Sequence, residues 1–315
     1  MFALRGYEWI FEGDIAACFD EIDHTALMER LRRRVGDRRV LHVVKAFLKA
    51  GLLDEAGTDR ETVTGTPQGG ILSPLLANLA LSALDDYFVD EWQRVSATHT
   101  DRTRLRRHGL PTFRLVRYAD DFVVLVHGTR EQAESLWGRV AAVLDTVGLR
   151  LTSDKTKVVH IDEGFDFLGF RIKRDVKRGG SRRYIYTYPS RKAVAAIMRK
   201  VKEATRQAIN DPLSRLLRHL NLVLQGWANY FRHGSSWDTF AYLGYYAWLR
   251  VGRWMRRKHP HRSWRWLRKR YSPNHRWHPE QDGVTLLNPA TTKIVRYRYR
   301  GAVIPSPWPR PGATI

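Results

Sequence analysis

Two apolar segments separated by a short acidic turn are the feature that most constrains the fold of this chain. FRLVRY and FVVLV, at residues 113–118 and 122–126, flank the tripeptide Ala119-Asp120-Asp121. Apolar runs of this length around such a turn predict an antiparallel β-hairpin with both aspartates at its tip. An isolated acidic turn is common in hairpins, so this segment alone predicts local structure and not a function.

Further strands and helices are predicted on both sides of this hairpin. Apolar periodicity indicates helices at 25–35, 75–88 and 131–146, the second with Ser73 as its cap, Pro74 at its first position and Leu75 on its buried side. Strands are expected at 9–15 and in KVVHI, FDFLGFRI and RRYIYTY. Because strands and helices intermix with hairpins, we predict an α+β fold rather than a doubly wound parallel sheet.

The chain changes character after residue 189. Helical periodicity at 193–209, 213–231 and 237–258 predicts an all-α bundle of about three helices, and the tail beyond it has one strand candidate at 293–299. Residues 1–189 contain 29 Lys and Arg against 27 Asp and Glu, whereas residues 190–315 contain 25 against 5. The net charge of +22 therefore resides almost wholly in the second part. It favours a nucleic-acid partner over an anionic membrane.

Composition also bears on the cellular environment. The single cysteine, Cys18, excludes an internal disulfide and a Cys-rich zinc site. No apolar run has the length of a membrane span, and the first residues do not form a signal peptide. We therefore expect a soluble protein of the cytoplasm, bacterial and associated with a ribonucleoprotein or the nucleoid, without a membrane partner.

Three aspartates are candidates for a metal site. Nucleotidyl transfer uses two divalent cations held by carboxylates, and Mg²⁺ prefers oxygen ligands. Asp14 at the end of a strand and Asp120 and Asp121 at the hairpin tip can supply such ligands if their strands are neighbours, which the sequence alone does not establish. Considered alone, Asp14 is equally explained as an ordinary residue at a strand end, and Asp120 and Asp121 as part of an ordinary turn.

Five segments in a fixed order carry a family resemblance. They resemble the palm motifs of reverse transcriptases, and specifically those of group II intron reverse transcriptase/maturases: GDIAACFDEIDH, GTPQGGILSPLLANLAL, RYADDFVVL, LTSDKTKVVHI and FDFLGFRI. The later segment from LNLVLQGWANYF to VGRWMRRKHP resembles the maturase domain of that family, also called the thumb or domain X. The resemblance implies a right-hand polymerase palm with an antiparallel sheet and helices at 1–189. It also implies an all-α thumb/maturase domain at 190–270, followed by a basic tail at 271–315.

The resemblance assigns roles to the acidic residues and their neighbour. Asp14 and Asp120 look like the two principal metal ligands, Asp121 resembles the supporting aspartate, and Ile15 would lend a backbone carbonyl to a metal. The implied cofactor is a pair of Mg²⁺ ions, with Mn²⁺ as a substitute.

Two further motifs resemble the nucleotide-binding parts of the family. Phe19, five residues after Asp14, matches the sugar gate, where an aromatic ring leaves no room for a 2′-hydroxyl and so selects deoxynucleotides. Gln68 and Gly69, within TPQGG, match the segment that lies against the incoming nucleotide. Without the other motifs, PQGG would equally be a loop that leads into a capped helix.

Three more residues complete the resemblance in the first part. Lys155 matches a lysine that contacts the triphosphate, although it also reads as a solvated surface residue. Leu168 and Gly169 match the primer grip, a hairpin that supports the primer end. Asp23 and His24 close the first motif, and we interpret both as structural.

The basic part supplies candidate RNA contacts. Cations neutralise phosphates and aromatic rings stack on unpaired bases, so their mixture is typical of RNA binding, although a charge run is often only a solvated face. We place Trp227, Trp248 and Trp254 in the core and regard His275, His278 and Glu280 as an incidental cluster. The predicted RNA-binding residues are Arg250, Arg253, Arg256, Arg257, Lys258, Arg265, Arg268, Lys269 and Arg270.

The chain departs from the family in two respects. Only 13 residues precede Asp14, where the family has fingers that clamp the triphosphate. We therefore expect an N-terminally truncated protein, either from a truncated reading frame or with the missing part encoded separately. In both cases polymerase activity of this chain by itself stays an open question. The cysteines of the family's C-terminal endonuclease are absent, so no DNA-cleaving domain is expected. The implied partners are group II intron RNA, an RNA template with a DNA primer, dNTPs, and a second copy or a complementing N-terminal fragment.

The sequence leaves three hypotheses about function open. The first is an enzyme, an RNA-directed DNA polymerase and intron maturase that acts in splicing and mobility of a mobile element. The second is an RNA-binding splicing cofactor without polymerase activity, in which the palm serves only as a scaffold. The third keeps the polymerase in a retron, diversity-generating or CRISPR-associated system, and the maturase-like helices after residue 190 argue against it.

Overall fold

The computed structural model describes residues 6–49, 52–53, 59–60, 64–66, 70–177, 179–207, 209–272 and 278–295. The chain divides into two compact units. The first unit comprises Met1–Leu168 and Ile172–Ile185, and the second comprises Gly169–Arg171 and Tyr186–Ile315.

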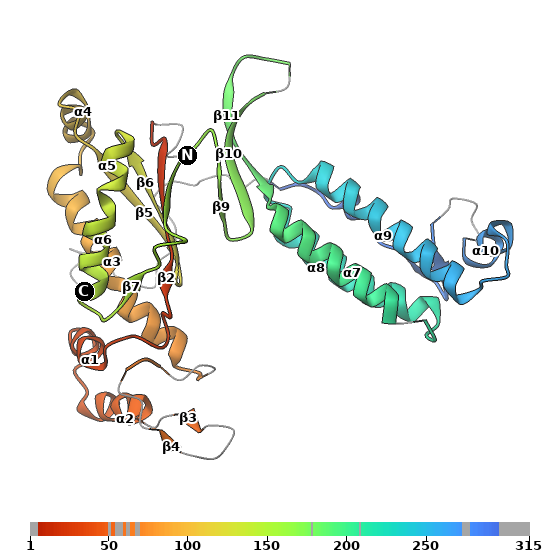
Figure 1. Ribbon diagram of the computed structural model, residues 1–315, viewed down its shortest axis with the longest axis horizontal. Coiled ribbons are helices and arrows are strands. Elements are labelled where there is room, and N and C mark those ends of the chain that lie inside the picture. Colours follow the sequence, from red (N-terminus) through yellow and green to blue (C-terminus); the bar gives the residue numbers. More distant parts are fainter. Residues whose placement is uncertain are drawn as a thin grey trace, which may run out of the picture. The chain divides into compact units, whose positions relative to one another are not determined.

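Helices and strands intermix along the first unit (Figure 1). Its helices are α1 (His24–Arg32), α2 (Arg38–Lys49), α3 (Ser73–Val95), α4 (His99–Arg107), α5 (Arg130–Glu134) and α6 (Leu136–Asp145). The strands that precede α5 are β1 (Trp9–Gly13), β2 (Ile15–Ala16), β3 (Leu52–Leu53), β4 (Asp59–Arg60), β5 (Thr112–Tyr118) and β6 (Asp121–His127). They are followed by β7 (Arg150–Leu151), β8 (Lys157–His160), β9 (Phe165–Phe167), β10 (Phe170–Val176) and β11 (Arg183–Pro189).

A four-stranded sheet forms the centre of this unit. Its order is β5-β6-β1-β8, and every neighbouring pair is antiparallel. In the β5–β6 hairpin Tyr118 pairs with Asp121, which leaves a loop of Ala119 and Asp120. The predicted acidic hairpin is therefore confirmed, and the prediction of an α+β fold is confirmed with it.

The sheet buries a different set of side chains on each face. Successive residues of a strand point to opposite faces, and the two sets are divided in that way along β1 and β6. Phe11, Val124 and Val126 belong to the main core with α1, α3 and α6, whereas Ile10 and Val123 pack with Phe165 of β9 in a second cluster. Figure 1 shows α3, α5 and α6 covering one face of the sheet.

The start of α3 differs from the prediction. The helix begins at Ser73 with Pro74 in its first turn, but Leu72 occupies the cap position and provides no side-chain hydrogen bond. Ser73 donates its backbone N–H to the carbonyl of Gly70, so it already lies inside a turn that runs into the helix and cannot act as the cap. Leu75, expected to be buried, is 64% exposed, because the core contacts the face that carries Leu76 and Ala80.

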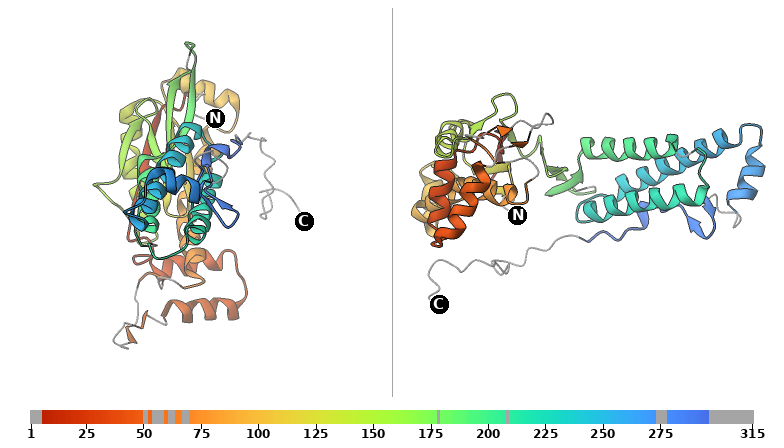
Figure 2. Two further views of the ribbon diagram at one scale, coloured as in Figure 1. Left: turned by 90° about the vertical axis from the view of Figure 1, so that its right-hand side faces the viewer. Right: turned by 90° about the horizontal axis from the view of Figure 1, so that it is seen from below.

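The second unit is a helical bundle with a small hairpin beside it. It contains α7 (Arg191–Gln207), α8 (Leu213–Phe231), α9 (Trp237–Lys258), α10 (Trp264–Tyr271), β12 (Glu280–Gln281), β13 (Val284–Thr285) and the 3₁₀ turn η2 (Pro289–Thr291). Figure 2 shows α7, α8 and α9 running side by side. Their shared core is formed by residues such as Val201, Leu220 and Val251, so the predicted all-α bundle is confirmed.

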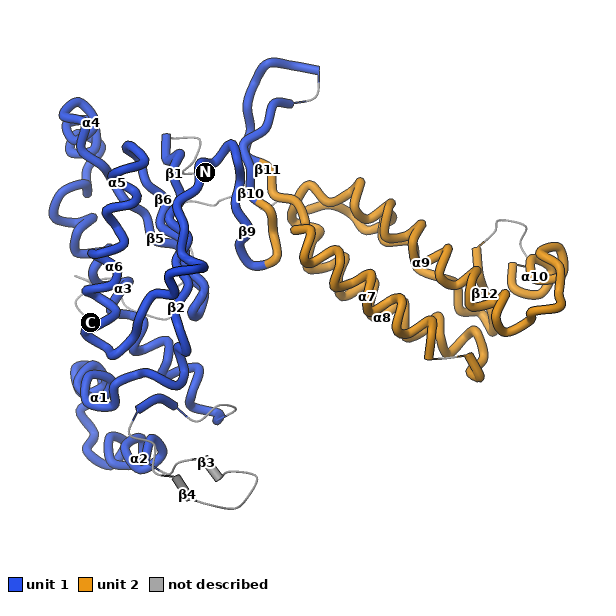
Figure 3. The backbone as a smooth tube through the Cα atoms, in the orientation of Figure 1, with its two compact units in different colours: residues 1–168, 172–185 blue, residues 169–171, 186–315 orange. Residues whose placement is uncertain are grey.

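The boundary between the units falls within two strands. Gly169, residues 170–171 of β10 and residues from 186 onward in β11 belong to the second unit, and the remainder of both strands belongs to the first (Figure 3). Phe170 packs with Phe231 and Ala193 inside the second unit. Among the described residues, no helix combines the length and the apolar character needed to cross a bilayer.

Candidate active site

The sheet brings the three predicted aspartates to one end of two paired strands. Gly13, the last residue of β1, pairs with Phe122 of β6. Asp14 follows Gly13 and Asp121 precedes Phe122, so in an antiparallel pair these two residues stand next to each other in register. Asp120 lies one residue further, in the hairpin loop. The sequence did not establish whether the strands that carry these aspartates are neighbours, and in the sheet β1 and β6 are paired.

A close contact between Gly13 and Phe122 fixes this pairing. A Cβ atom on Gly13 would overlap the aromatic ring of Phe122. The ring itself is buried at 2% exposure and lies 6.4 Å from that of Phe11, measured between ring centroids. Only glycine allows the ring to lie across the strand at this point. Sequence reasoning did not single out Gly13, although a glycine at the end of an apolar strand is a signal for such an approach.

Arg117 connects the aspartate turn to helix α3. Its Nη1 donates to the carbonyl oxygen of Ala119 at 2.8 Å and to Oδ1 of Asn78 at 3.0 Å. Its Nε donates to Oδ2 of Asp85 at 3.1 Å, and the same carboxylate pairs with Nη2. Ala119 has φ +53°, a left-handed conformation that is unusual for a side chain with a Cβ. Arg117 therefore holds the turn that carries Asp120, a role that the sequence pattern did not reveal.

Lys155 lies beside Asp14. Its Nζ is 3.3 Å from Oδ2 of Asp14, with the lysine side chain 69% exposed and the aspartate side chain 38% exposed. The surrounding segment encloses Asp14, because Thr152 donates its N–H to the Asp14 carbonyl at 2.8 Å and Thr156 Oγ1 accepts from the Asp14 N–H at 3.3 Å. Lys155 is therefore a solvated surface residue, as the sequence allowed, and it also contacts the predicted metal ligand Asp14.

Ile15 and Phe19 lie shortly after Asp14, in a strand and in the turn that follows it. Ile15 is buried and pairs with Leu151 in the short β2–β7 ladder. The backbone then turns at Ala17, which has φ +39°, and the N–H of Asp20 donates to the Ala17 carbonyl at 2.8 Å. Phe19 is half-buried and packs against the main core. The predicted gate residue therefore stands in a constrained turn, five residues after Asp14.

Residues 64–66 lie against this turn. The N–H of Thr66 donates to the Phe19 carbonyl at 2.6 Å, and Gly65, at φ +85°, approaches Phe19 and Asp20 so closely that a Cβ would overlap their carbonyl groups. His24 Nε2 is 2.6 Å from the Gly65 carbonyl oxygen. The predicted nucleotide-binding residues Gln68 and Gly69 come shortly afterwards in the sequence and lie outside the described residues.

Asp23 and His24 have the structural roles that the sequence suggested. Asp23 is the N-cap of α1 and accepts a hydrogen bond from the N–H of Ala26 at 2.7 Å. His24 joins the start of the same helix to Gly65. Together they hold the first and second motifs against each other.

Cys18, between Ile15 and Phe19, is a buried neutral thiol. Burial raises its pKa to about 11, and the negative charges of Asp120 and Asp20 act in the same direction against the opposing charge of Arg117. The thiol is therefore protonated at neutral pH and is not a nucleophile. Its electrostatic interaction with Asp120 shows that the hairpin tip lies close to the turn after Asp14.

The donor set at this end of the sheet is chemically suited to a hard divalent cation. Asp14, Asp120 and Asp121 offer carboxylate oxygens, which Mg²⁺ and Mn²⁺ prefer. Within the described ranges, no three His, Cys, Asp or Glu side chains are placed to hold one ion together. The Asp14 carboxylate instead pairs with Lys155, whose charge compensates it.

The predicted primer-grip residues form a tight turn. Leu168 and Gly169 separate β9 from β10 and have φ +49° and φ +77°. Positive φ at both central residues is the pattern of a type I′ hairpin turn, which Gly accepts without strain and Leu rarely adopts. The Gly169 carbonyl accepts a hydrogen bond from the N–H of Ser190 at 2.8 Å.

Several predicted RNA-binding residues make hydrogen bonds inside the second unit. Arg257 Nη2 donates to the Thr205 carbonyl at 2.6 Å, and Lys258 Nζ donates to the Ile209 carbonyl at 3.2 Å. Arg250 contacts the side chain of Thr205. Arg257 thus bonds a carbonyl in the last turn of α7, where backbone carbonyls lack helical partners, and Lys258 bonds one just beyond the helix.

The other predicted RNA-binding residues lie on α9 and α10. Arg256 lies over the ring of Trp264, with its Cζ 5.5 Å from the ring centroid. Arg268 is half-buried, whereas Arg253, Arg265, Lys269 and Arg270 are exposed.

The tryptophans follow the prediction in part. Trp254 is buried at 1% exposure, and Trp227 and Trp248 pack against the cores while remaining half-exposed. In the small cluster of the tail, His275 lies outside the described residues, and His278 and Glu280 border a groove beside β13.

Comparison with known proteins assigns both parts of the chain. Residues 1–172 match the family model for reverse transcriptase (RNA-dependent DNA polymerase), and residues 194–272 match the model for the group II intron maturase-specific domain. The first match covers more than half of the 315 residues, so the chain belongs to the reverse transcriptase family. The second match gives it the maturase-specific domain of group II introns, in agreement with the resemblance seen in the motifs.

Three relatives illustrate the extent of the similarity. Protein YkfC of Escherichia coli is 37% identical over 199 residues, which cover 59% of this chain and 52% of YkfC. The group II intron-encoded protein LtrA of Lactococcus lactis is 30% identical over 220 residues, covering 56% of this chain and 36% of LtrA. The putative COX1/OXI3 intron 1 protein of Saccharomyces cerevisiae is 26% identical over 285 residues, covering 79% of this chain and 32% of that protein. The chain thus spans between about a third and about half of the length of these relatives.

Proposed function

We propose that this chain is the RNA-directed DNA polymerase and maturase part of a group II intron protein. It copies RNA into DNA by nucleotidyl transfer and binds intron RNA to assist splicing and mobility. The observation that supports this most directly is the register that sets Asp14 beside Asp121, with Asp120 in the adjoining loop, inside the segment matched by the reverse transcriptase model.

The carboxylates hold the catalytic cations in this proposal. Asp14 and Asp120 are the principal ligands, Ile15 adds its carbonyl oxygen, and Asp121 supports the pair. Two Mg²⁺ ions, or Mn²⁺ in their place, would neutralise charge on the reacting phosphate and activate the primer 3′-hydroxyl. Lys155, which pairs with Asp14 and is highly exposed, would be in place to contact the negative charge of the triphosphate.

The same proposal places the substrates around the aspartates. Phe19 excludes the 2′-hydroxyl of the incoming nucleotide, so that dNTPs are selected. Gln68 and Gly69 lie against that nucleotide, and Leu168 and Gly169 support the primer end. The rigid turn at Ala17 and the hydrogen bond from Thr66 to Phe19 support a fixed position for the ring.

The remaining assignments concern the domains and their partners. Residues 1–189 form the palm, 190–270 the thumb or maturase domain and 271–315 a basic tail. The partners are intron RNA, an RNA template with a DNA primer and dNTPs, together with a second copy or a complementing N-terminal fragment, in the bacterial cytoplasm. RNA contacts are made by the exposed cations of the second unit and by its remaining predicted residues.

Primer extension on an RNA template tests the enzymatic proposal. The chain, alone and with an N-terminal segment of a relative added in trans, should extend a DNA primer with dNTPs. Phe19→Ala should admit rNTPs at a rate raised at least about tenfold relative to dNTPs, because the ring no longer blocks the 2′-hydroxyl. Absence of any extended product under both conditions would sink the proposal.

A second candidate function is a splicing cofactor that binds RNA and does not polymerise. The charge distribution favours it, since 25 of the 30 charged residues after residue 189 are basic. It predicts steeply salt-dependent binding of intron RNA and no primer extension. Equal affinity for intron RNA and an unrelated structured RNA would exclude a specific maturase role.

A further inference from the structure

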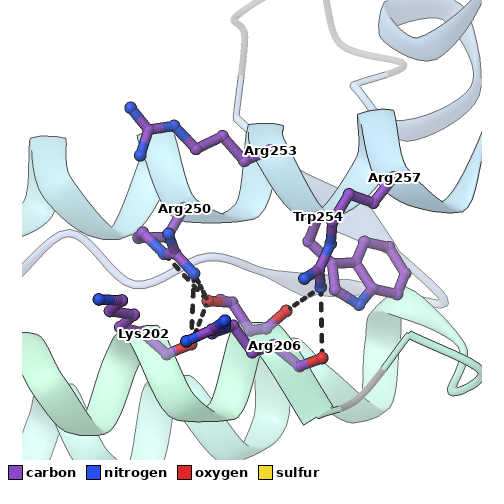
Figure 4. A pocket seen from close by; sticks show the side chains of 7 residues that line it. Lys202, Arg206, Arg250, Arg253, Trp254 and Arg257 are labelled. Atoms are coloured by element: carbon purple, nitrogen blue, oxygen red, sulfur yellow. Dashed lines mark hydrogen bonds between the residues drawn. The ribbon is translucent and has the colours of Figure 1, made fainter. Parts of the chain in front are cut away.

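A basic pocket of about 320 Å³ lies between α7 and α9 in the second unit (Figure 4). Lys202, Thr205 and Arg206 border it from α7, and Arg250, Trp254 and Arg257 border it from α9. Arg253 also borders the pocket, but its guanidinium points away from α7. No acidic residue lines it, and none of these cations forms an ion pair with a carboxylate in the described part of the chain.

Two of the arginines are held rigidly across the gap between the helices. Arg250 Nε and Nη2 donate to Thr205 Oγ1 at 3.1 and 3.0 Å, and Nη2 also lies 3.3 Å from the Lys202 carbonyl oxygen. Arg257 Nη2 donates to the carbonyl of Thr205. A guanidinium has five N–H donors, so each arginine retains donors for a ligand after these bonds are made.

The charges in the pocket are compensated only in part. Burial lowers the pKa of Arg250, and the positive charges of Arg253, Arg257 and Arg206 lower it further against the opposing effect of Tyr246. Backbone carbonyls at the end of α7 supply only partial negative charge. An anion between the helices would therefore relieve repulsion, and preordered guanidinium groups favour a phosphate, which they bind with two parallel hydrogen bonds.

We propose that this pocket binds one phosphate group of an RNA backbone, with Arg250 and Arg257 as the inner clamp and Lys202 and Arg206 at its exposed rim. Trp254, buried at 1% exposure, forms its apolar floor. That the phosphate belongs to RNA rests on the proposed function. A free polyphosphate offers the same phosphate groups to the pocket.

The rim cations allow a test that leaves the fold intact. Lys202 and Arg206 are exposed, and no hydrogen bond from either side chain is among those that hold α7 to α9. The pocket variant is therefore Lys202→Gln with Arg206→Gln. A matched control is Lys192→Gln with Lys200→Gln, which removes the same charge from exposed positions of α7 that do not line the pocket. Thermal unfolding of both variants should match that of the wild type.

Binding of a structured RNA is then measured as a function of salt with the full chain. Each neutralised phosphate contributes about −0.9 to the slope of log affinity against log salt, or about −0.7 for a single strand. The pocket variant should lose about one such unit and about tenfold in affinity at low salt, and the control should change by less than about threefold. Equal losses in the two variants would overturn the proposal.

A second arm identifies the source of the phosphate. If tripolyphosphate raises the melting temperature of the wild type and the control but not that of the pocket variant, phosphate binding is supported with a free polyphosphate as ligand. If only RNA binding distinguishes the variants, the RNA backbone is the ligand. Failure of the maturase function would appear differently, as wild-type affinity that is the same for intron and unrelated RNA.

Discussion

Gly13 and Phe122 determine how closely the two aspartate-bearing strands approach. Gly13→Ala should lower the free energy of unfolding by about 1–3 kcal/mol, because the new methyl group overlaps a buried ring that must move. Denaturant unfolding of the purified chain measures this change. Adding Phe122→Leu should restore part of the loss, since the smaller side chain leaves room for the methyl group.

The control for this substitution is Gly138→Ala in α6. A Cβ on Gly138 meets no atom within 4 Å, and alanine favours a helix over glycine by about 1 kcal/mol. This variant should therefore be at least as stable as the wild type. A Gly13→Ala chain of unchanged stability would show that the ring does not lie across the strand.

Arg117 provides a second prediction at the scale of single residues. Arg117→Gln removes the contacts to Ala119 and Asp85, and Arg30→Gln removes a comparable ion pair between α1 and Asp86 of the same helix α3. Both should lose about 1–3 kcal/mol of stability. Only Arg117→Gln should also lower the primer-extension rate of the folded protein, by about tenfold or more, because it frees the turn of Asp120. Equal rates in the two variants would make Arg117 a purely structural residue.

Local patterns predicted some elements well and missed others. The ends of α8 and α9 agree with the predicted 213–231 and 237–258, because long apolar stripes define both helices. The apolar periodicity predicted no helix at α4, since its nine residues include no buried position and only its capping box, Thr98 with Asp101, indicates a helix. The pairing of β1 with β6 links residues more than a hundred positions apart, and no local pattern contains that information.

Ion pairs of Arg174 with two carboxylates predict that the stability of the first unit depends on pH. Arg174 in β10 contacts Glu8 and Asp162, and its hydrogen bonds to these carboxylates lower the pKa of each below the ordinary values of 4.5 and 3.8. Both groups therefore bind protons more readily in the unfolded chain. Their contribution to stability is complete above these ordinary values and is lost as the pH falls further.

The free energy of unfolding should decline as the pH falls from 6 to 3, a range of about three units around these values. The decline should be smaller in Arg174→Gln. Arg130→Gln serves as the control, because the Arg130–Glu134 pair is exposed on both sides and contributes little. A decline of the same steepness in all three proteins would assign the pH dependence to other carboxylates.

The proposed catalytic residues and most of the net positive charge lie in different parts of the chain. The aspartates lie in the unit matched by the reverse transcriptase model, and most of the net positive charge lies in the sequence that includes the maturase-specific domain. Composition alone predicted the uneven charge distribution, because charge counts need no knowledge of pairing, whereas the aspartates were assigned from the motifs around them. The inward hydrogen bonds of Arg250, Arg257 and Lys258 could not be predicted, since they depend on the packing of α9 against α7.

The most direct test of the account measures two properties of one variant. Asp120→Asn removes a carboxylate from the proposed metal site, and Asp145→Asn, at an exposed position in α6, removes the same charge elsewhere. We predict that Asp120→Asn lowers primer extension on an RNA template by about a thousandfold, or roughly 4 kcal/mol, and leaves intron RNA affinity within about threefold. Asp145→Asn should change neither property. Extension that survives in Asp120→Asn, or RNA binding lost together with it, would contradict the division of catalysis and RNA binding between the two parts of the chain.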